Sequence, residues 1–336
     1  MTSYWQDFPG MPEALERVSG IIRETSASEN PIISQGLSGL FNGQGKLLRP
    51  GLLLIAGGFG KTQAKHYTLA ACLEMLHMAT LIHDDVIDES PTRRGQPAVH
   101  TQYGNRNAVL MGDYLLSRCF LLAAEYTSAD NAVGLARVIA TICGMEIEQN
   151  SDRFRTNISL RRYLRKIMGK SAMLFSLACY IGASEAKVSR ALTARLRRIG
   201  YNIGMAFQII DDILDYAGDP AAVRKPLGND LKEGLITLPL ICAFRGETPA
   251  QASRKEGAPS QDGAAALRGL FSADHFSVGD SGAIISLVQN SGGLEAARSY
   301  AEKYTARAIR EIAALPAGGP RDMLDRLTRL LLVREA

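Results

Sequence analysis

Two aspartate clusters with identical spacing are the residues of this chain best suited to chemistry. One is Asp84, Asp85 and Asp88 in LIHDDVIDE, and the other is Asp211, Asp212 and Asp215 in QIIDDILDYAG. Residues four apart share one face of an α-helix, so we expect the outer carboxylates of each cluster to project together, with the middle one turned about 100° away. Both clusters stand in apolar sequence, where ionised carboxylates are costly unless they are neutralised.

Divalent cations are suitable partners for such carboxylates. Mg²⁺ binds through oxygen and usually shares its carboxylates with a substrate phosphate. A single acidic triplet is usually a solvated helix face, but two copies flanked by Ile, Leu and Val favour a metal-dependent site for a phosphorylated substrate. Two such helices facing one another would hold several metal ions around a diphosphate, although the spacing alone does not identify the reaction.

Composition narrows the class of protein. With 336 residues, 46% of them hydrophobic, the chain can bury a large core, and a formal charge of +4 is too mild to indicate a nucleic-acid partner. Five cysteines without a C-x-x-C pair indicate a reducing compartment. No secretion signal and no apolar run of about 20 residues is visible, so we expect a soluble, cytoplasmic protein without a transmembrane segment.

Helical periodicity dominates the sequence, and it predicts an all-α fold in a single domain over residues 1–336. A polar stretch rich in Gly, Pro, Ala and Ser, residues 246–263, predicts a mobile surface loop. The expected helices are Glu13–Thr25, Pro50–Gly57, Thr68–Glu89, Asn107–Tyr126, Asn131–Gln149, Leu160–Ile181, Ala191–Tyr216, Leu238–Arg245, Gly293–Leu315 and Pro320–Val333.

A diphosphate carries several negative charges, so a site built of carboxylates also needs cations. Arg93 and Arg94 directly follow the first cluster on an expected loop, and Lys46 and Arg49 stand in a glycine-containing segment that a phosphate can approach closely. His77 lies two helical turns before the first cluster on roughly the same face. Taken singly, each of these residues could instead be surface charge or a core histidine.

Five further strings extend the pattern: LEMLHMATLIHDDVIDESPTRRGQPAVH, GKLLRP, GKSAMLF, AFQIIDDILDYAGD and KPLGNDLKEGLITLPLI. With these strings in the family's order, the chain resembles the trans-type polyprenyl diphosphate synthases, from about Trp5 to the last helix. It is most similar to the medium- and long-chain branch, in particular to catalytic subunits of the heptaprenyl type. The resemblance implies a bundle of mostly antiparallel helices around a central cavity, forming a homodimer or a heterodimer with a small subunit.

The resemblance also implies the reaction and the residues that perform it. Isopentenyl diphosphate condenses head-to-tail with an allylic diphosphate, such as farnesyl or geranylgeranyl diphosphate, to build the side chain of a quinone. About three Mg²⁺ ions would be held by Asp84, Asp88 and Asp211, with the other three aspartates in support. The allylic diphosphate would be contacted by Arg93, Lys170, Ser171, Gln208 and Lys225. Isopentenyl diphosphate would be held by Lys46, Arg49, His77 and Arg94.

Three positions bear on activity and product length. Many relatives have a lysine in place of Leu235, so we expect a weaker grip on the allylic diphosphate without loss of activity. Short-chain relatives carry bulky aromatic residues where this chain has Ala79 and Thr80, just before the first cluster. Small side chains there would let the growing chain pass, which predicts a product longer than about twenty carbons and a shorter one for Ala79→Phe.

Three alternatives remain open. A metal-dependent phosphohydrolase is suggested by the pair His83–Asp84, although such enzymes need further histidine ligands and the chain has five histidines in total. A catalytically silent partner subunit is disfavoured by the two complete acidic clusters. Squalene- or terpene-synthase chemistry on the same fold is disfavoured by the residues expected to hold isopentenyl diphosphate.

Overall fold

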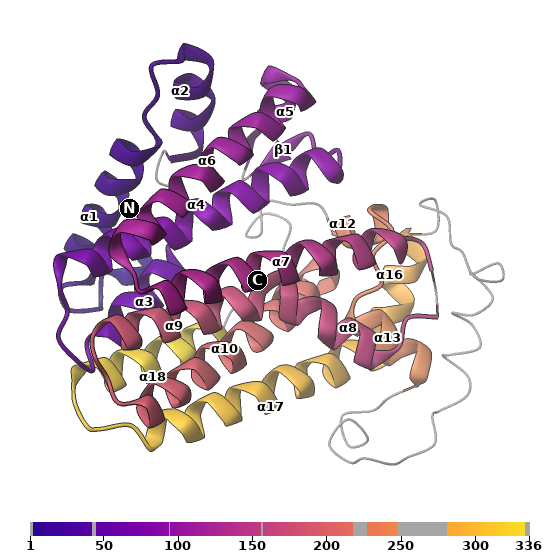
Figure 1. The fold of residues 1–336 in the computed structure, drawn as a ribbon. Helices are drawn as coiled ribbons and strands as arrows, with labels where there is room; N and C mark the ends of the chain where they lie inside the picture. The colour runs from indigo at the N-terminus through magenta and orange to yellow at the C-terminus, as the bar shows by residue number, and fades with distance from the viewer. Residues whose placement is uncertain are drawn as a thin grey trace. The chain divides into compact units, whose positions relative to one another are not determined.

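The computed structural model describes residues 3–41, 45–93, 95–155, 157–217, 227–246 and 281–332. In these residues helices predominate, with one short antiparallel pair of strands, and the all-α prediction is confirmed (Figure 1). The chain forms two compact units. Unit 1 comprises residues 1–137, 175–197 and 316–324, and unit 2 comprises residues 138–174, 198–315 and 325–336. The single domain expected from the sequence stays a prediction.

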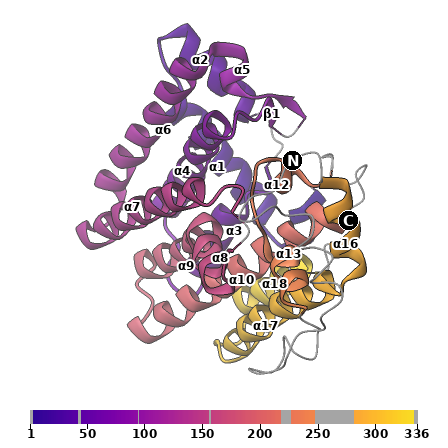
Figure 2. The same cartoon turned by 90° about the vertical axis from the view of Figure 1, so that its right-hand side faces the viewer.

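Unit 1 is organised around a pair of long helices, α4 (Ala64–Ile87) and α6 (Asn105–Tyr126), which run side by side (Figures 1 and 2). Small side chains allow their close approach. A Cβ at Gly112 of α6 would stand 2.3 Å from the His83 ring of α4. The other elements wholly within this unit are η1 (Ser3–Trp5), α1 (Met11–Ser26), α2 (Pro31–Ser38), η2 (Gly39–Phe41), α3 (Leu48–Gly57), β1 (Thr92–Arg93), β2 (Gln96–Pro97) and α5 (Val99–Tyr103).

Unit 2 has its own core, which includes the fully buried Tyr163, Tyr216 and Ile209. Within it α13 (Leu238–Arg245) and α17 (Gly293–Ala313) pack closely, and a Cβ at Gly293 would stand 2.5 Å from the Pro239 carbonyl oxygen. Its other elements are α8 (Leu160–Ile167), the π-helical turn η3 (Met168–Ala172), α12 (Asn229–Lys232) and α16 (Ser281–Asn290). The chain passes between the units within α7 (Ala129–Ser151), α9 (Met173–Glu185), α10 (Arg190–Ala217) and α18 (Gly319–Leu332).

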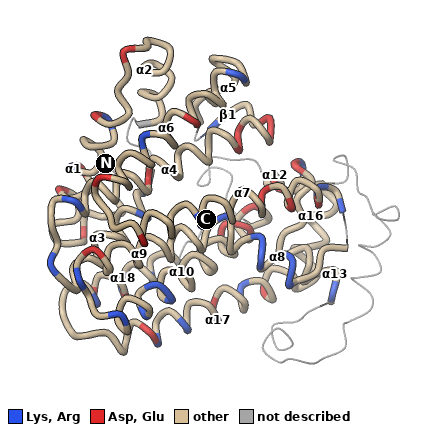
Figure 3. Tube along the Cα trace, viewed as in Figure 1, with Lys and Arg blue, Asp and Glu red and all other residues tan. Residues whose placement is uncertain are grey.

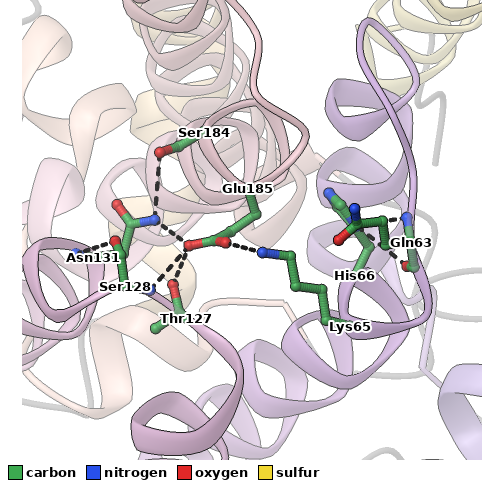
Figure 4. A network of polar contacts seen from close by, with 8 residues as sticks. All are labelled: Gln63, Lys65, His66, Thr127, Ser128, Asn131, Ser184 and Glu185. Carbon is green, nitrogen blue, oxygen red and sulfur yellow. Dashed lines mark hydrogen bonds and ion pairs between the residues drawn. The ribbon is translucent and has the colours of Figure 1, made fainter.

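A buried carboxylate ties three helix ends of unit 1 together (Figure 4). Glu185, the last residue of α9, is 5% exposed and pairs with Lys65 in the first turn of α4. Its other oxygen accepts hydrogen bonds from the Thr127 hydroxyl, from the Ser128 backbone N–H at 3.2 Å and from the Asn131 amide at 2.6 Å. Although burial acts in the opposite direction, these donors and Lys65 lower the pKa of Glu185 to about 2.

The predicted long helices are present, with ends that differ by a few residues. The sequence missed short elements, namely α2, α5, α12 and α16, because too few residues carry their periodicity. Apart from Gly246, the predicted loop 246–263 lies outside the described residues. Two helical stretches, Asn105–Tyr126 and Leu160–Glu185, have the length and mean hydropathy of a membrane span, and 39% and 67% of their apolar windows are buried in the protein. The expected absence of a transmembrane segment therefore stays a prediction.

Candidate active site

The first acidic cluster lies at the carboxyl end of α4. Asp84 and Asp85 occupy its last turn, and Asp88 caps it by donating its backbone N–H to the Asp84 carbonyl oxygen at 2.8 Å. The carboxyl end of a helix carries partial negative charge, which repels carboxylates. Asp84 and Asp88 are half-buried. Three acids at this end of a helix make a site that attracts cations.

The middle carboxylate of this cluster is held by the protein. Asp85 is 3% exposed and accepts hydrogen bonds from Arg93 Nε at 2.9 and 3.1 Å, with Arg93 Nη2 as a further donor. A hairpin supplies the arginine: β1 pairs with β2, Arg93 lies opposite Gln96, and Gly95 in the turn has a positive φ of 77°. Burial acts in the opposite direction, but the hydrogen bonds and charge of Asp85 raise the pKa of Arg93.

The second cluster repeats this arrangement near the carboxyl end of α10. Asp211 is exposed, whereas Asp212 is 4% exposed and accepts hydrogen bonds from the Tyr163 hydroxyl at 2.6 Å and from the Gln208 amide at 2.9 Å. Ser171 in turn donates its hydroxyl to the Gln208 side-chain oxygen. In each cluster, therefore, the middle aspartate is a buried acceptor of protein hydrogen bonds and the first is more accessible.

Asp215 has a local structural function. Its two carboxylate oxygens accept the backbone N–H groups of Asn229 and Asp230, each at 3.0 Å, at the start of α12. The Gly228 N–H also bonds to the Asp215 backbone oxygen at 2.8 Å. The amino end of a helix presents unsatisfied N–H groups, so this carboxylate fixes α12 against the end of α10.

Burial and charge shift the pKa values of three groups around Asp212. Burial and the nearby Asp230 raise the pKa of Asp212, although Tyr163 and Gln208 favour its ionised form. Burial and the Asp212 carboxylate raise the pKa of the Tyr163 hydroxyl. Burial and the neighbouring Lys170 lower the pKa of Lys166.

Lys170 and Ser171 stand on the π-helical turn η3, which interrupts the run from α8 to α9. The turn lies close to α7, because a Cβ at Gly169 would stand 2.1 Å from the Met145 sulfur. Lys170 is exposed and Ser171 is 4% exposed. π-Helical turns are frequent at functional sites, where they re-aim side chains.

The residues expected to bind isopentenyl diphosphate come from three segments of unit 1. Lys46 is exposed, and its backbone oxygen accepts the Trp5 indole N–H at 2.6 Å. Arg49, in the first turn of α3, is 8% exposed, with its guanidinium carbon 5.1 Å from the Phe175 ring centroid. His77 is half-buried on α4. Arg94 and Lys225 lie outside the described residues.

Unit 1 contains a cavity of about 760 Å³, within the range of small-molecule sites. Its α4 wall is formed by Glu74, Met78, Leu81, Ile82 and Asp85. The two positions expected to control product length lie beside this wall. Ala79 is fully buried, and Thr80 is half-buried and donates its hydroxyl to the His77 carbonyl oxygen at 2.8 Å. Their effect on product length stays a prediction.

The structure brings predicted residues together within each unit. Asp84, Asp85, Asp88 and Arg93 gather in unit 1, and Lys170, Ser171, Gln208, Asp211 and Asp212 gather in unit 2. Because the clusters belong to different units, their facing one another stays a prediction. No three His, Cys, Asp or Glu side chains among the described residues form a metal-binding group on their own. His83 turns toward α6, with Nε2 3.2 Å from the Val109 carbonyl oxygen.

Sequence reasoning missed Tyr163, Lys166 and Asp230. A weak signal existed for the first two, since Tyr163 and Lys166 precede Lys170 by seven and four residues and so fall on one side of a continuous helix. Asp230 had no such signal, because its proximity to Asp212 depends on the packing of α12 beside α10 and not on a local spacing.

Comparison with known proteins identifies the family. Residues 30–266 match the family described as polyprenyl synthetase. The chain belongs to this family. The predicted family, fold class and prenyltransferase class of enzyme are thereby confirmed, and prenyl chain elongation is favoured over hydrolysis or a silent subunit. The family depends on divalent metal ions.

Two relatives named as prenyl diphosphate synthases match nearly the whole length of the chain. It is 34% identical over 321 residues to heptaprenyl diphosphate synthase component 2 of Geobacillus stearothermophilus, covering 95% of this chain and 92% of the relative. It is 35% identical over 335 residues to the geranyl-diphosphate-specific all-trans-nonaprenyl-diphosphate synthase of Rhodobacter capsulatus, covering 98% and 95%.

Solved structures of prenyl synthases have a similar fold. Heptaprenyl diphosphate synthase from Staphylococcus aureus has a TM-score of 0.86 at 28% identity, covering 97% of this chain and 99% of that one. A polyprenyl synthase from Caulobacter crescentus CB15, complexed with calcium and isoprenyl diphosphate, has a TM-score of 0.85 at 33% identity, covering 97% and 96%.

Proposed function

We propose that this chain condenses isopentenyl diphosphate with an allylic diphosphate, head-to-tail and in the trans configuration, to give a medium- or long-chain polyprenyl diphosphate. The observation that carries the proposal is the shared construction of the two acidic clusters. Each lies near the carboxyl end of a long helix, and each has a buried middle aspartate bonded to protein donors beside a more accessible first aspartate. Relatives named as heptaprenyl and nonaprenyl diphosphate synthases support the substrates and the product class.

Asp84, Asp88 and Asp211 fit magnesium, because carboxylate oxygens are its preferred ligands and these side chains are half-buried or exposed. In our proposal they hold about three Mg²⁺ ions. Bound metal supplies Lewis-acid stabilisation of the negative charge on the departing diphosphate. Asp85, Asp212 and Asp215 support these ligands by fixing Arg93, Tyr163 and the start of α12.

Arg93 and Lys170 hold the allylic diphosphate. The Asp85 carboxylate accepts hydrogen bonds from Nε and Nη2 of Arg93, and this orients the guanidinium. The other N–H donors of the guanidinium then point away from Asp85. Lys170 is an exposed ammonium on η3. Lys225, which lies outside the described residues, is proposed as a third cation. These groups favour ionisation of the C–O bond because they stabilise the charge that develops on the leaving oxygen.

Lys46, Arg49, His77 and Arg94 hold isopentenyl diphosphate. Its double bond attacks the allylic carbocation, a new C–C bond forms, and a proton is lost to the departed diphosphate. Gln208, oriented by Ser171 and Asp212, presents a side-chain oxygen beside the reaction site, and the carbonyl groups of η3 add further negative potential. Apolar side chains exclude water that would quench the carbocation.

We propose a second copy of this chain as the partner. In unit 1, α6 exposes a row of large apolar side chains, Val109, Leu110, Phe120 and Leu121, which are 40%, 55%, 49% and 44% exposed. Exposed apolar rows of this kind mark association surfaces. A heterodimer with a small subunit is the alternative, supported by the name "component 2" of one relative. We further propose that the protein is cytoplasmic and that its product becomes the side chain of a quinone.

Purified protein, incubated alone with labelled isopentenyl diphosphate, Mg²⁺ and farnesyl or geranylgeranyl diphosphate, tests the function. We expect elongated products by chromatography, and their loss in Asp84→Ala and Asp211→Ala. Light scattering gives the mass of the particle in solution, and we expect the wild type to be a dimer and Leu110→Asp to be a monomer. Absence of elongated product from this chain alone would contradict the proposed activity, and a product that appears only with a small subunit would establish the heterodimer.

A further inference from the structure

Lys166 is a cation beside the second acidic cluster that the mechanism above does not use. It stands on α8, one of the most basic segments of the chain, together with Arg161, Arg162 and Arg165 (Figure 3). Unlike the exposed Arg161, Arg162 and Arg165, Lys166 is only partly exposed. Arg162, four residues earlier, lies on the same side of α8 and pairs with Asp152.

The neighbours of Lys166 on its helix belong to the site around the second acidic cluster. Tyr163, three residues earlier, bonds to Asp212, and Lys170, four residues later, is the proposed diphosphate ligand. The charges that act on Lys166 come from Lys170, Asp230, Asp212 and Glu146. The ammonium group therefore shares the electrostatic surroundings of the second cluster, which an outward-facing helix residue would not.

Lys166 also lines a small hollow with Leu235 and Ile236, next to Tyr163. Charged side chains line this hollow as well, namely those of Arg162, Asp152 and Glu148. Leu235 is 3% exposed and its side chain supplies no charge to the hollow. Lys166 thus brings an ammonium group to the hollow from α8, beside the Arg162 guanidinium that pairs with Asp152. A long flexible lysine stem can pack along apolar side chains while its ammonium group reaches a polar site.

We propose that Lys166 is a further ligand of the allylic diphosphate, acting beside Lys170. This inference rests on the proposed function. Asp212 does not require Lys166 to satisfy its oxygens, because they already accept hydrogen bonds from Tyr163 and Gln208. Two ammonium groups held close together on one side of a helix repel one another, and a bound dianion or trianion removes that repulsion. The lowered pKa of Lys166, caused by burial and by Lys170, agrees with a site shaped for an anion.

Substitution tests the assignment. Lys166→Met removes the charge and keeps the length of the stem, and Lys166→Gln serves if the first variant is unstable. A charge-assisted hydrogen bond contributes about 1.5–3 kcal/mol, equivalent to about 10- to 150-fold in binding. We therefore expect the KM for the allylic diphosphate, and the Kd for inorganic diphosphate with Mg²⁺, to rise at least about tenfold, while the KM for isopentenyl diphosphate stays within about twofold.

Three comparisons sharpen the test. Lys166→Arg keeps the charge and should bind diphosphate within about threefold of the wild type. Arg165→Met removes a charge from the exposed side of the same helix and should leave both KM values unchanged. Adding Leu235→Lys to Lys166→Met returns a cation to the hollow, and it should recover most of the lost affinity.

The inference is overturned if folded Lys166→Met and Lys166→Gln bind inorganic diphosphate as the wild type does, or if the KM values of both substrates rise equally. Failure of the proposed function would look different. The wild type would then make no elongated product, whereas titration of inorganic diphosphate by calorimetry would still report whether Lys166 contributes to an anion site.

Discussion

The buried Glu185 carboxylate gives a prediction whose size can be worked out from the structure. Glu185→Ala removes the partner of Lys65 and leaves the donors of Thr127, Ser128 and Asn131 without their acceptor. Breaking a buried ion pair costs about 3–5 kcal/mol. The lower end applies, because the Lys65 side chain is 25% exposed and water can reach it.

The pKa of Glu185 leads to a similar magnitude. A pKa lowered from 4.5 to about 2 corresponds to about 3 kcal/mol of folding stability, since each unit is worth about 1.4 kcal/mol. A carboxylate with a depressed folded-state pKa stabilises the protein above its unfolded-state pKa. That stability is lost as the pH falls from about 5 toward about 2.

Urea unfolding of Glu185→Gln and Glu185→Ala is the assay, followed by fluorescence of Trp5, the chain's one tryptophan, which is buried in unit 1. We expect about 3 kcal/mol of destabilisation at pH 7 for Glu185→Ala, less for Glu185→Gln, and a difference from the wild type that shrinks between pH 5 and pH 3. Glu16→Gln is the matched control, because the Glu16–Arg23 pair is exposed and its loss should cost under about 1 kcal/mol. A difference that stays constant over this pH range would refute the electrostatic reasoning.

Other predictions concern unit 2. Tyr163→Phe removes a donor to the buried Asp212 and should destabilise this unit by about 2 kcal/mol in thermal unfolding, whereas no change would mean that water replaces the hydroxyl. Gly169→Ala places a Cβ 2.1 Å from the Met145 sulfur, so calorimetry should give a loss of about 1–3 kcal/mol; Gly134→Ala, where a Cβ meets nothing within 4 Å, is the control. Asp215→Ala should speed hydrogen exchange in α12, because the carboxylate holds its first N–H groups, and unchanged exchange would contradict that role.

Much of the fold could be predicted from the sequence because periodicity extends over many residues. The long helices α4 and α10 were expected close to their observed ends, and with them the positions of both acidic clusters. The short elements could not be predicted from the sequence. α12 has four residues, too few for a periodic pattern, and it is held by Asp215, which lies at the end of α10, 14 residues before Asn229.

The site could be predicted only where chemistry follows from residue type and spacing. Carboxylates at a repeated spacing indicated metal and phosphate, and Arg93 follows the first cluster directly. The different environments of the aspartates within a cluster could not be predicted. The burial of Asp212 depends on Tyr163 reaching it from α8, a contact across 49 positions of the chain. No local pattern encodes such a contact.

The π-helical turn η3 sets the direction of the side chains that it carries. A wide turn accommodates one more residue than regular α-geometry allows. Deleting a single residue from Met168–Ala172 would restore regular α-geometry there and leave the flanking helices in their present orientation, because the wide turn takes up the extra residue locally. The side chains of the turn itself, Lys170 and Ser171, would be re-aimed, and Ser171 would lose its hydrogen bond to Gln208.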